Sequence, residues 1–270
     1  MSGQQRLVIQ GGKRLEGEIT VQGAKNSALP ILAAAALCGG ETTLFNCPRL
    51  TDCDAALRIL TSLGCACRRE GNCVVINASA LSSSFIPSKL MREMRSSIIF
   101  MGTLLGRERQ CKLSFPGGCE IGARPIDFHI EAFRRMGADI REEHGYLVCS
   151  AKRLKGARIA LPLPSVGATE NILLAAVLAE GKTEIHNAAR EPEIVDLAGF
   201  LTKCGAKISG AGSGTITVEG VEALHGCDYS IMPDRIAAET YLCCGAITRG
   251  ELVLSRADYA SMGAVTSVLE

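Results

Sequence analysis

The sequence repeats itself, and this repeat limits the possible folds more than any other feature. Each copy predicts an amphipathic helix, a glycine that ends it, a short strand, a polar turn and a second strand. The copies occupy residues 57–76, 130–149 and 197–218, and their glycines, Gly64, Gly137 and Gly205, lie 73 and 68 residues apart. Self-similarity on this scale indicates a supersecondary unit that occurs several times in one fold.

A second element recurs with the same period and consists of an apolar helix, a glycine and a strand. It is found at residues 33–47, 100–115, 173–188 and 241–256. Three units are therefore predicted in full, and a fourth begins. The fourth stops within a predicted helix at 261–270, so we expect a chain that is cut short in that unit.

The hydrophobic pattern predicts which faces are buried. The helix at 171–179 is apolar on all sides, so it belongs inside the fold. The strands at 183–187 and 215–219 alternate, so their sheets cover a core on one face and meet water on the other. This pattern predicts an α/β fold with helices inside and sheets outside. A solenoid of βα repeats is the alternative, although the period is long for one.

Composition excludes several function classes. The 270 residues predict about two domains. The net charge of +1 gives no basic face, so nucleic acid is not an expected partner. The start shows no signal peptide, and apolar stretches such as 28–38 are too short to span a membrane. We therefore expect a soluble protein of the cytoplasm.

Cysteine is abundant, with 13 residues. Without a signal peptide disulfides are not expected, and the spacing is poor for zinc, so most cysteines are interpreted as small core residues. Cys119 differs because it follows two glycines and precedes Arg124 in the stretch FPGGCEIGARPIDFH. A nearby cation favours a reactive thiol, while an ordinary glycine turn is the alternative interpretation.

Six motifs in order along the chain resemble the enolpyruvyl transferase family, and within it the members that act on a sugar nucleotide. They are GAKNSALP (23–30), MREMRSSI (91–98), FPGGCEIGARPIDFH (115–129), PSVGATENI (164–172), NAAREPEIVD (187–196) and MPDRIAAETY (232–241). The resemblance implies an inside-out α/β barrel fold of βαβαββ units, three to a domain. One complete domain is implied at 24–233, and 1–23 with 234–270 form an incomplete part of the other.

The resemblance also implies a reaction. The enolpyruvyl group of phosphoenolpyruvate moves to the 3′-hydroxyl of UDP-N-acetylglucosamine, which is the first committed step of peptidoglycan synthesis. The reaction passes through a tetrahedral ketal intermediate, which then releases phosphate. No metal or organic cofactor is required. The implied partners are these two substrates, with neither nucleic acid nor membrane.

Site residues follow from the same motifs. Cys119 matches the acid that the family carries on a loop and that fosfomycin alkylates, Lys25 and Asn26 match residues that hold phosphoenolpyruvate, and Arg124 matches a phosphate ligand. The implied sugar-nucleotide residues are Arg95, Pro125, Ile126, Asp127, Phe128, Ser165, Val166 and Gly167. Leu163 departs from the pattern, because some members carry a lysine there that contacts the diphosphate.

Other interpretations remain open for these residues. Lys25 and Asn26 could simply cap a helix that begins near Ser27, and Arg95 could be a solvated helix residue. The family's sugar-hydroxyl base and two arginines match nothing in this sequence. The chain is therefore either part of such an enzyme or an inactive fragment that at most binds the nucleotide, with possible self-association through the incomplete domain. The related 3-phosphoshikimate enzyme is a further alternative.

Overall fold

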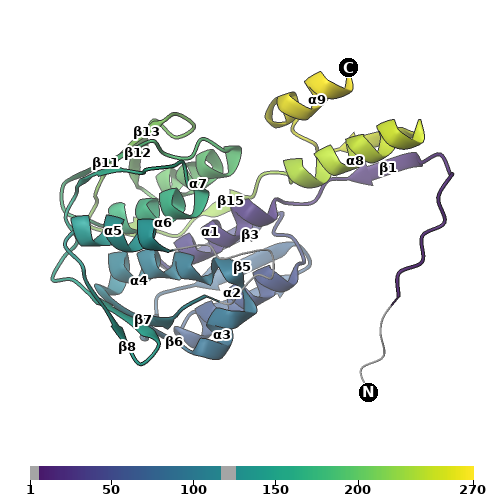
Figure 1. The fold of residues 1–270 in the computed structure, drawn as a ribbon. Helices are drawn as coiled ribbons and strands as arrows, with labels where there is room; N and C mark the ends of the chain where they lie inside the picture. Colours follow the sequence, from purple (N-terminus) through teal and green to yellow (C-terminus); the bar gives the residue numbers. More distant parts are fainter. Residues whose placement is uncertain (1–5, 117–125) are drawn as a thin grey trace. The chain divides into compact units, whose positions relative to one another are not determined.

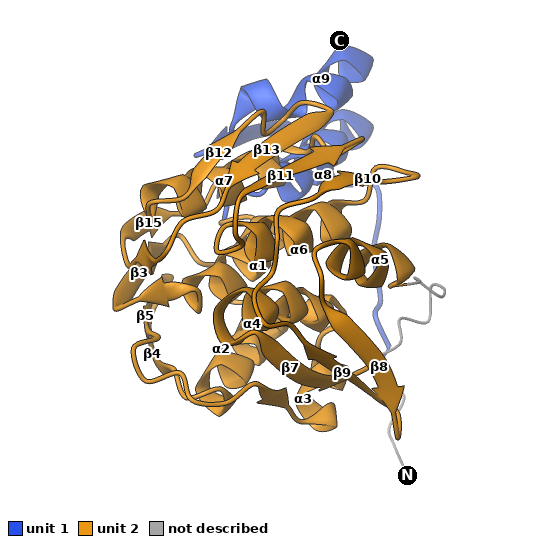
Figure 2. Ribbon diagram, turned by 90° about the vertical axis from the view of Figure 1, so that its left-hand side faces the viewer, with its two compact units in different colours: residues 1–22, 233–270 blue, residues 23–232 orange. Residues whose placement is uncertain are grey.

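The computed structural model describes residues 6–116 and 126–270, and the chain divides into two compact units. The larger unit is residues 23–232 and the smaller unit is residues 1–22 with 233–270, coloured orange and blue in Figure 2. Cys119, Arg124 and Pro125 lie outside the described residues.

Three four-stranded sheets with the same topology build the larger unit (Figure 1). Their strand orders are β15-β3-β5-β4, β6-β7-β9-β8 and β10-β11-β13-β12, in which the first pair is parallel and the others antiparallel. The strands are β3 (Glu41–Phe45), β4 (Ala66–Glu70), β5 (Cys73–Asn77), β6 (Phe85–Ile86), β7 (Gln110–Ser114), β8 (Asp139–Glu143), β9 (Tyr146–Ser150), β10 (Arg158–Ala160), β11 (Lys182–His186), β12 (Lys207–Ser209), β13 (Thr215–Glu219) and β15 (Asp228–Ser230), with a short pair β2 (Cys38–Gly39) and β14 (Leu224–His225).

Helices fill the space between these sheets, as Figure 2 shows. They are α1 (Lys25–Ala35), α2 (Thr51–Ser62), α3 (Ser88–Glu93), the 3₁₀ helix η1 (Arg95–Ile99), α4 (Phe100–Glu108), α5 (Asp127–Arg135), α6 (Val166–Ala176) and α7 (Pro192–Lys203). Most residues of α1 and α6 are buried, whereas β11 and β13 alternate between buried and exposed side chains. The prediction of inner helices and outer sheets is therefore confirmed.

The repeat closes on itself rather than running on as a solenoid. The strand β15, at the end of the larger unit, pairs in parallel with β3 near its start and gives the first sheet the same four strands as the others. Seven of the described cysteines are buried in this unit, in agreement with their interpretation as small core residues.

The three glycines that end the repeated helices share one backbone conformation. Gly64, Gly137 and Gly205 have φ angles of 101°, 90° and 104°, a region that side chains with a Cβ rarely adopt. The backbone N–H of the residue after each glycine bonds back to a helix carbonyl five residues earlier, as from Cys65 to Leu60. Each glycine thus ends its helix and reverses the chain into the next strand, as the repeat predicts.

From residue 6 onward, the smaller unit contains a parallel strand pair and three helical segments. β1 (Glu16–Thr20) pairs with β16 (Glu251–Ser255), and α8 (Arg235–Thr248) precedes β16. η2 (Tyr259–Met262) and α9 (Gly263–Leu269) follow. Val21, Ala238 and Met262 are buried together, while much of α8 is exposed. Across residues 6–116 and 126–270, every helix is too short or too polar to span a bilayer.

Candidate functional site

The described residues of the predicted site lie at the starts of four helical elements in the larger unit. Lys25 and Asn26 open α1, and Arg95 opens η1. Ile126 precedes α5, whose first residues are Asp127 and Phe128. Ser165 is the N-cap of α6, and Val166 and Gly167 form its first turn. Helix starts present backbone N–H groups and favour anions, which suits phosphate-bearing ligands.

The start of α1 corrects one interpretation of the sequence. The helix begins at Lys25, two residues earlier than expected, and its N-cap is Ala24, which offers no capping side chain. Asn26 therefore lies inside the first turn and is exposed, so it is free of a capping role. The Lys25 ammonium lies 2.6 Å from the Asp52 carboxylate and keeps a side-chain exposure of 45%. Both side chains remain accessible to a ligand.

A partly buried polar network holds this helix start, and no sequence pattern predicted it. Asp196 of α7 accepts hydrogen bonds from the Ser27 hydroxyl, from the Tyr229 hydroxyl at 2.7 Å and from the backbone N–H of Met232 at 3.2 Å. Burial, followed by the hydrogen bond and charge of Asp196, raises the pKa of Tyr229 above its usual range. Ser27 directly follows Asn26, so Asp196 anchors the turn that carries both predicted ligands.

Replacing Asp196 by asparagine is expected to lower the free energy of unfolding by about 2 kcal/mol. The amide places hydrogens where the carboxylate accepted them, which leaves the Met232 N–H without an acceptor. Urea denaturation measures the change. Asp139→Asn is the matched control. Asp139 forms an ion pair with Arg141 at the surface, and such exposed pairs contribute little to the free energy of unfolding. Equal stabilities of the two variants would contradict the anchoring role of Asp196.

Arg95 lies at the start of η1 and is half-buried. No ion pair joins it to any acidic side chain within the described ranges. A half-buried guanidinium gains from an opposite charge beside it, because an ionised group that loses water is stabilised by one. The role of Arg95 in holding a phosphate group stays a prediction.

The start of α6 packs against a histidine to which the sequence assigned no chemistry. His129 of α5 is 7% exposed, and a Cβ on Gly167 would lie only 3.6 Å from its ring. Burial lowers the pKa of His129 to about 4, against the opposing effect of Asp127. The ring is therefore neutral at physiological pH. The four histidines show no common spacing, so only the packing of α5 against α6 identifies this one.

A buried acid in α6 has a raised pKa. Glu170 is 7% exposed, and burial, followed by the charges of Glu193 and Glu191, raises its pKa well above the usual range. A raised pKa favours the protonated form of Glu170, which lowers the cost of burying this side chain near two other acidic residues.

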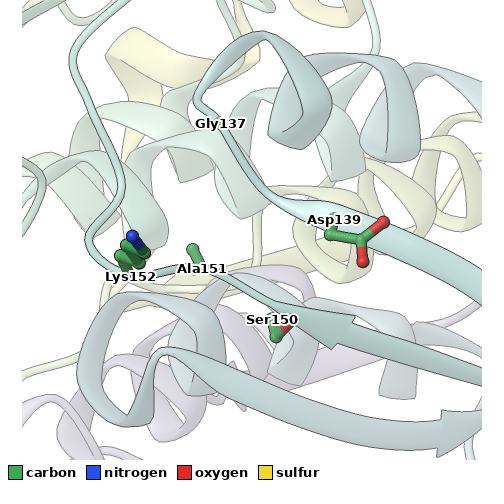
Figure 3. Close-up of a pocket in the computed structure, with 5 residues that line it drawn as sticks. All are labelled: Gly137, Asp139, Ser150, Ala151 and Lys152. Atoms are coloured by element: carbon green, nitrogen blue, oxygen red, sulfur yellow. The ribbon is translucent and has the colours of Figure 1, made fainter.

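An open pocket elsewhere in the larger unit is separate from these residues. Gly137, Asp139, Ser150, Ala151 and Lys152 line it at the ends of β8 and β9, as Figure 3 shows. None of the predicted site residues is in its lining. The helix starts, rather than this pocket, carry the candidate chemistry.

Comparisons with known proteins agree with the motifs. The family described as EPSP synthase (3-phosphoshikimate 1-carboxyvinyltransferase) matches residues 9–270. UDP-N-acetylglucosamine 1-carboxyvinyltransferase 2 of Caldanaerobacter subterraneus subsp. tengcongensis is 54% identical over 252 residues, covering 93% of this chain and 60% of that protein. The UDP-N-acetylglucosamine 1-carboxyvinyltransferase of Endomicrobium trichonymphae is 53% identical with the same coverage. The chain spans about 60% of the length of these curated relatives.

Solved structures share the fold. The enolpyruvyl transferase NikO of Streptomyces tendae superposes with a TM-score of 0.78 at 25% identity and covers 88% of this chain and 56% of its own. EPSP synthase of Acinetobacter baumannii gives a TM-score of 0.70 at 23% identity, with 92% and 57% covered. The repeated sheets, the inner helices and the matched family together establish that this chain belongs to the EPSP synthase family of enolpyruvyl transferases.

Proposed function

We propose that this chain carries part of an enzyme that transfers the enolpyruvyl group of phosphoenolpyruvate to the 3′-hydroxyl of UDP-N-acetylglucosamine. The observation that carries the proposal is the 54% identity, over 93% of the chain, to a relative named for that reaction. In this role the enzyme serves peptidoglycan synthesis, works in the cytoplasm and takes these two compounds as its partners.

In the proposed reaction, different residues act on the two ends of phosphoenolpyruvate. Addition places a proton on C3 of phosphoenolpyruvate and forms a bond between C2 and the sugar oxygen, whose hydroxyl proton passes to a base that no residue of this sequence matches. Elimination then removes a proton from C3 and releases phosphate. Cys119 is proposed as the acid toward C3, while Lys25, Asn26 and Arg124 hold the phosphate and carboxylate. A positioned acid accelerates such a step by about 10²–10⁴-fold. The larger unit is proposed as the domain that supplies these groups.

The sugar nucleotide is proposed to bind across η1, α5 and α6. Arg95 and the N-terminus of α6 are proposed to contact the anionic groups. Pro125, Ile126, Asp127 and Phe128 are proposed to contact the uridine, with Ser165, Val166 and Gly167 on its other side. The sequence places Leu163 where some relatives carry a lysine, and this side chain is 66% exposed. The diphosphate therefore lacks one cation here, which should weaken its binding.

Two ligand experiments test the proposal on residues 1–270. Fosfomycin should label Cys119 in preference to the other cysteines, and peptide mass spectrometry locates the adduct. UDP-N-acetylglucosamine should bind in a calorimetric titration, about a thousandfold or more weakly than to a longer relative that supplies further contacts. The 270 residues offer no matched sugar-hydroxyl base, so binding without turnover is expected.

Parallel titrations separate the alternatives. Binding of 3-phosphoshikimate in preference to the sugar nucleotide would favour the reaction named by the family description. Fosfomycin labelling scattered over several cysteines would contradict the role of Cys119. Absence of binding by either ligand would contradict the proposed function and leave the family membership alone.

Self-association is proposed for the smaller unit. The side chains of Ile247 and Val268 are 85% and 84% exposed, and Tyr241 and Val253 are also accessible. Apolar side chains in such numbers on one small unit favour association. Sedimentation velocity should therefore show oligomers that Ile247→Glu disperses, and an unchanged monomer across concentrations would contradict the proposal.

A further inference from the structure

One buried side chain, Asn171, connects the elements that carry the proposed nucleotide residues. It lies in α6 and is fully buried. Its Oδ1 accepts the backbone N–H of Gly102 at 2.7 Å. Its Nδ2 donates to the carbonyl of Ile98 at 2.9 Å and to Nδ1 of His129 at 2.8 Å. A single amide thus bonds to η1, α4 and α5 from within α6.

The orientation of this amide follows from its partners. The Gly102 N–H can only donate, so it requires the oxygen, and the Ile98 carbonyl can only accept, so it requires the nitrogen. The second hydrogen of Nδ2 then points to Nδ1 of His129, which must be unprotonated. Because burial keeps His129 neutral, its hydrogen is on Nε2. Every hydrogen-bonding group of the Asn171 side chain has a partner.

Close backbone packing surrounds this amide. A Cβ on Gly102 would lie 2.2 Å from the backbone oxygen of Asn171, so α4 and α6 approach within a distance that only glycine permits. The ring of His129 packs against Gly167 in the first turn of α6. A shift in any one of these elements would therefore break hydrogen bonds in the low-dielectric interior, where they cannot be replaced by water.

We propose that Asn171 is a positioning residue for the sugar-nucleotide site. Ile98 lies three residues after Arg95, and His129 lies two after Asp127. Asn171 itself follows the N-cap Ser165 by six residues. The amide sets the spacing of these three segments without touching the ligand. The inference rests on the proposed function, since it takes Arg95, Asp127 and Ser165 to be nucleotide ligands.

The variant Asn171→Asp tests the positioning directly. It keeps the shape and removes the amide hydrogens that Ile98 and His129 require. We expect faster amide hydrogen exchange in η1, in α5 and at the start of α6 together. Thr103→Val is the matched control, because Thr103 is also fully buried and donates to Ala33 at 3.2 Å but bonds to none of these segments. Faster exchange confined to α6 would overturn the inference.

Affinity supplies the functional readout. A small displacement of the residues that contact a ligand weakens its binding. Asn171→Asp should therefore bind UDP-N-acetylglucosamine about tenfold or more weakly than the unsubstituted chain. Thr103→Val should stay within about twofold. Unchanged affinity in an Asn171→Asp chain whose three segments exchange faster would overturn the inference.

A second variant and a separate outcome keep the test decisive. If Asn171→Asp does not fold, His129→Leu removes one acceptor with little change in volume and should show the same pattern in α5 and α6. If the unsubstituted chain does not bind UDP-N-acetylglucosamine, the proposed function is contradicted. The exchange measurements then still decide whether Asn171 couples the three segments.

Discussion

Replacing Cys119 by serine is expected to lower turnover by about a thousandfold in a chimera of residues 1–270 and the C-terminal remainder of the Caldanaerobacter relative. The relative is 54% identical over the shared region, so the joined chains should assemble one active site. A serine hydroxyl is a far weaker acid than a thiol, and loss of a positioned acid costs about 10²–10⁴-fold. Phosphate release from phosphoenolpyruvate and UDP-N-acetylglucosamine measures the effect.

The control for this prediction is Cys73→Ser. Cys73 lies in β5 and is partly buried, outside every motif of the candidate site. Its replacement should leave turnover within about twofold, as for a substitution distant from the chemistry. Calorimetry should show that Cys119→Ser retains its affinity for the sugar nucleotide. An undiminished rate in Cys119→Ser would exclude Cys119 as the acid.

Local patterns predicted the architecture because the information lies within a few residues. Gly64, Gly137 and Gly205 each end a helix through a backbone conformation that glycine alone adopts readily, so the repeat could be read directly. Burial of α6 followed in the same way from a helix that is apolar on all sides. The start of α1 was misplaced by two residues because no capping side chain marks it.

The supports of the site could not be predicted. Ser27 and Asp196 are 169 residues apart in sequence, and His129 and Asn171 are 42 apart. No short-range pattern connects such pairs, since they meet only when the repeated units pack around a common centre. All four of these residues lie in the same family motifs as the proposed ligand residues, but the motifs do not indicate which side chains meet.

Acidification should destabilise the larger unit through His129. Its pKa is about 4 in the folded chain against an ordinary value of 6.5. Between pH 4 and pH 6.5, His129 binds a proton in the unfolded chain but not in the folded chain. The free energy of unfolding therefore rises with pH across this window and falls as the pH is lowered. The full change is about 3 kcal/mol, and protonation would also place a hydrogen on Nδ1 against the Asn171 amide.

Urea denaturation of the His129→Asn variant at pH 7.5 and pH 4.5 isolates this contribution. Carboxylates titrate in the same range, so the measured quantity is the difference in pH dependence between the variant and the unsubstituted chain. Asparagine keeps an acceptor but cannot be protonated, and the variant should therefore lose about 2.5 kcal/mol less between pH 7.5 and pH 4.5. His144→Asn, at an exposed turn position with φ of 51° that asparagine tolerates, should retain the original pH dependence. If His129→Asn and the unsubstituted chain lose equal stability between the two pH values, His129 is not held neutral by its burial beside Asn171.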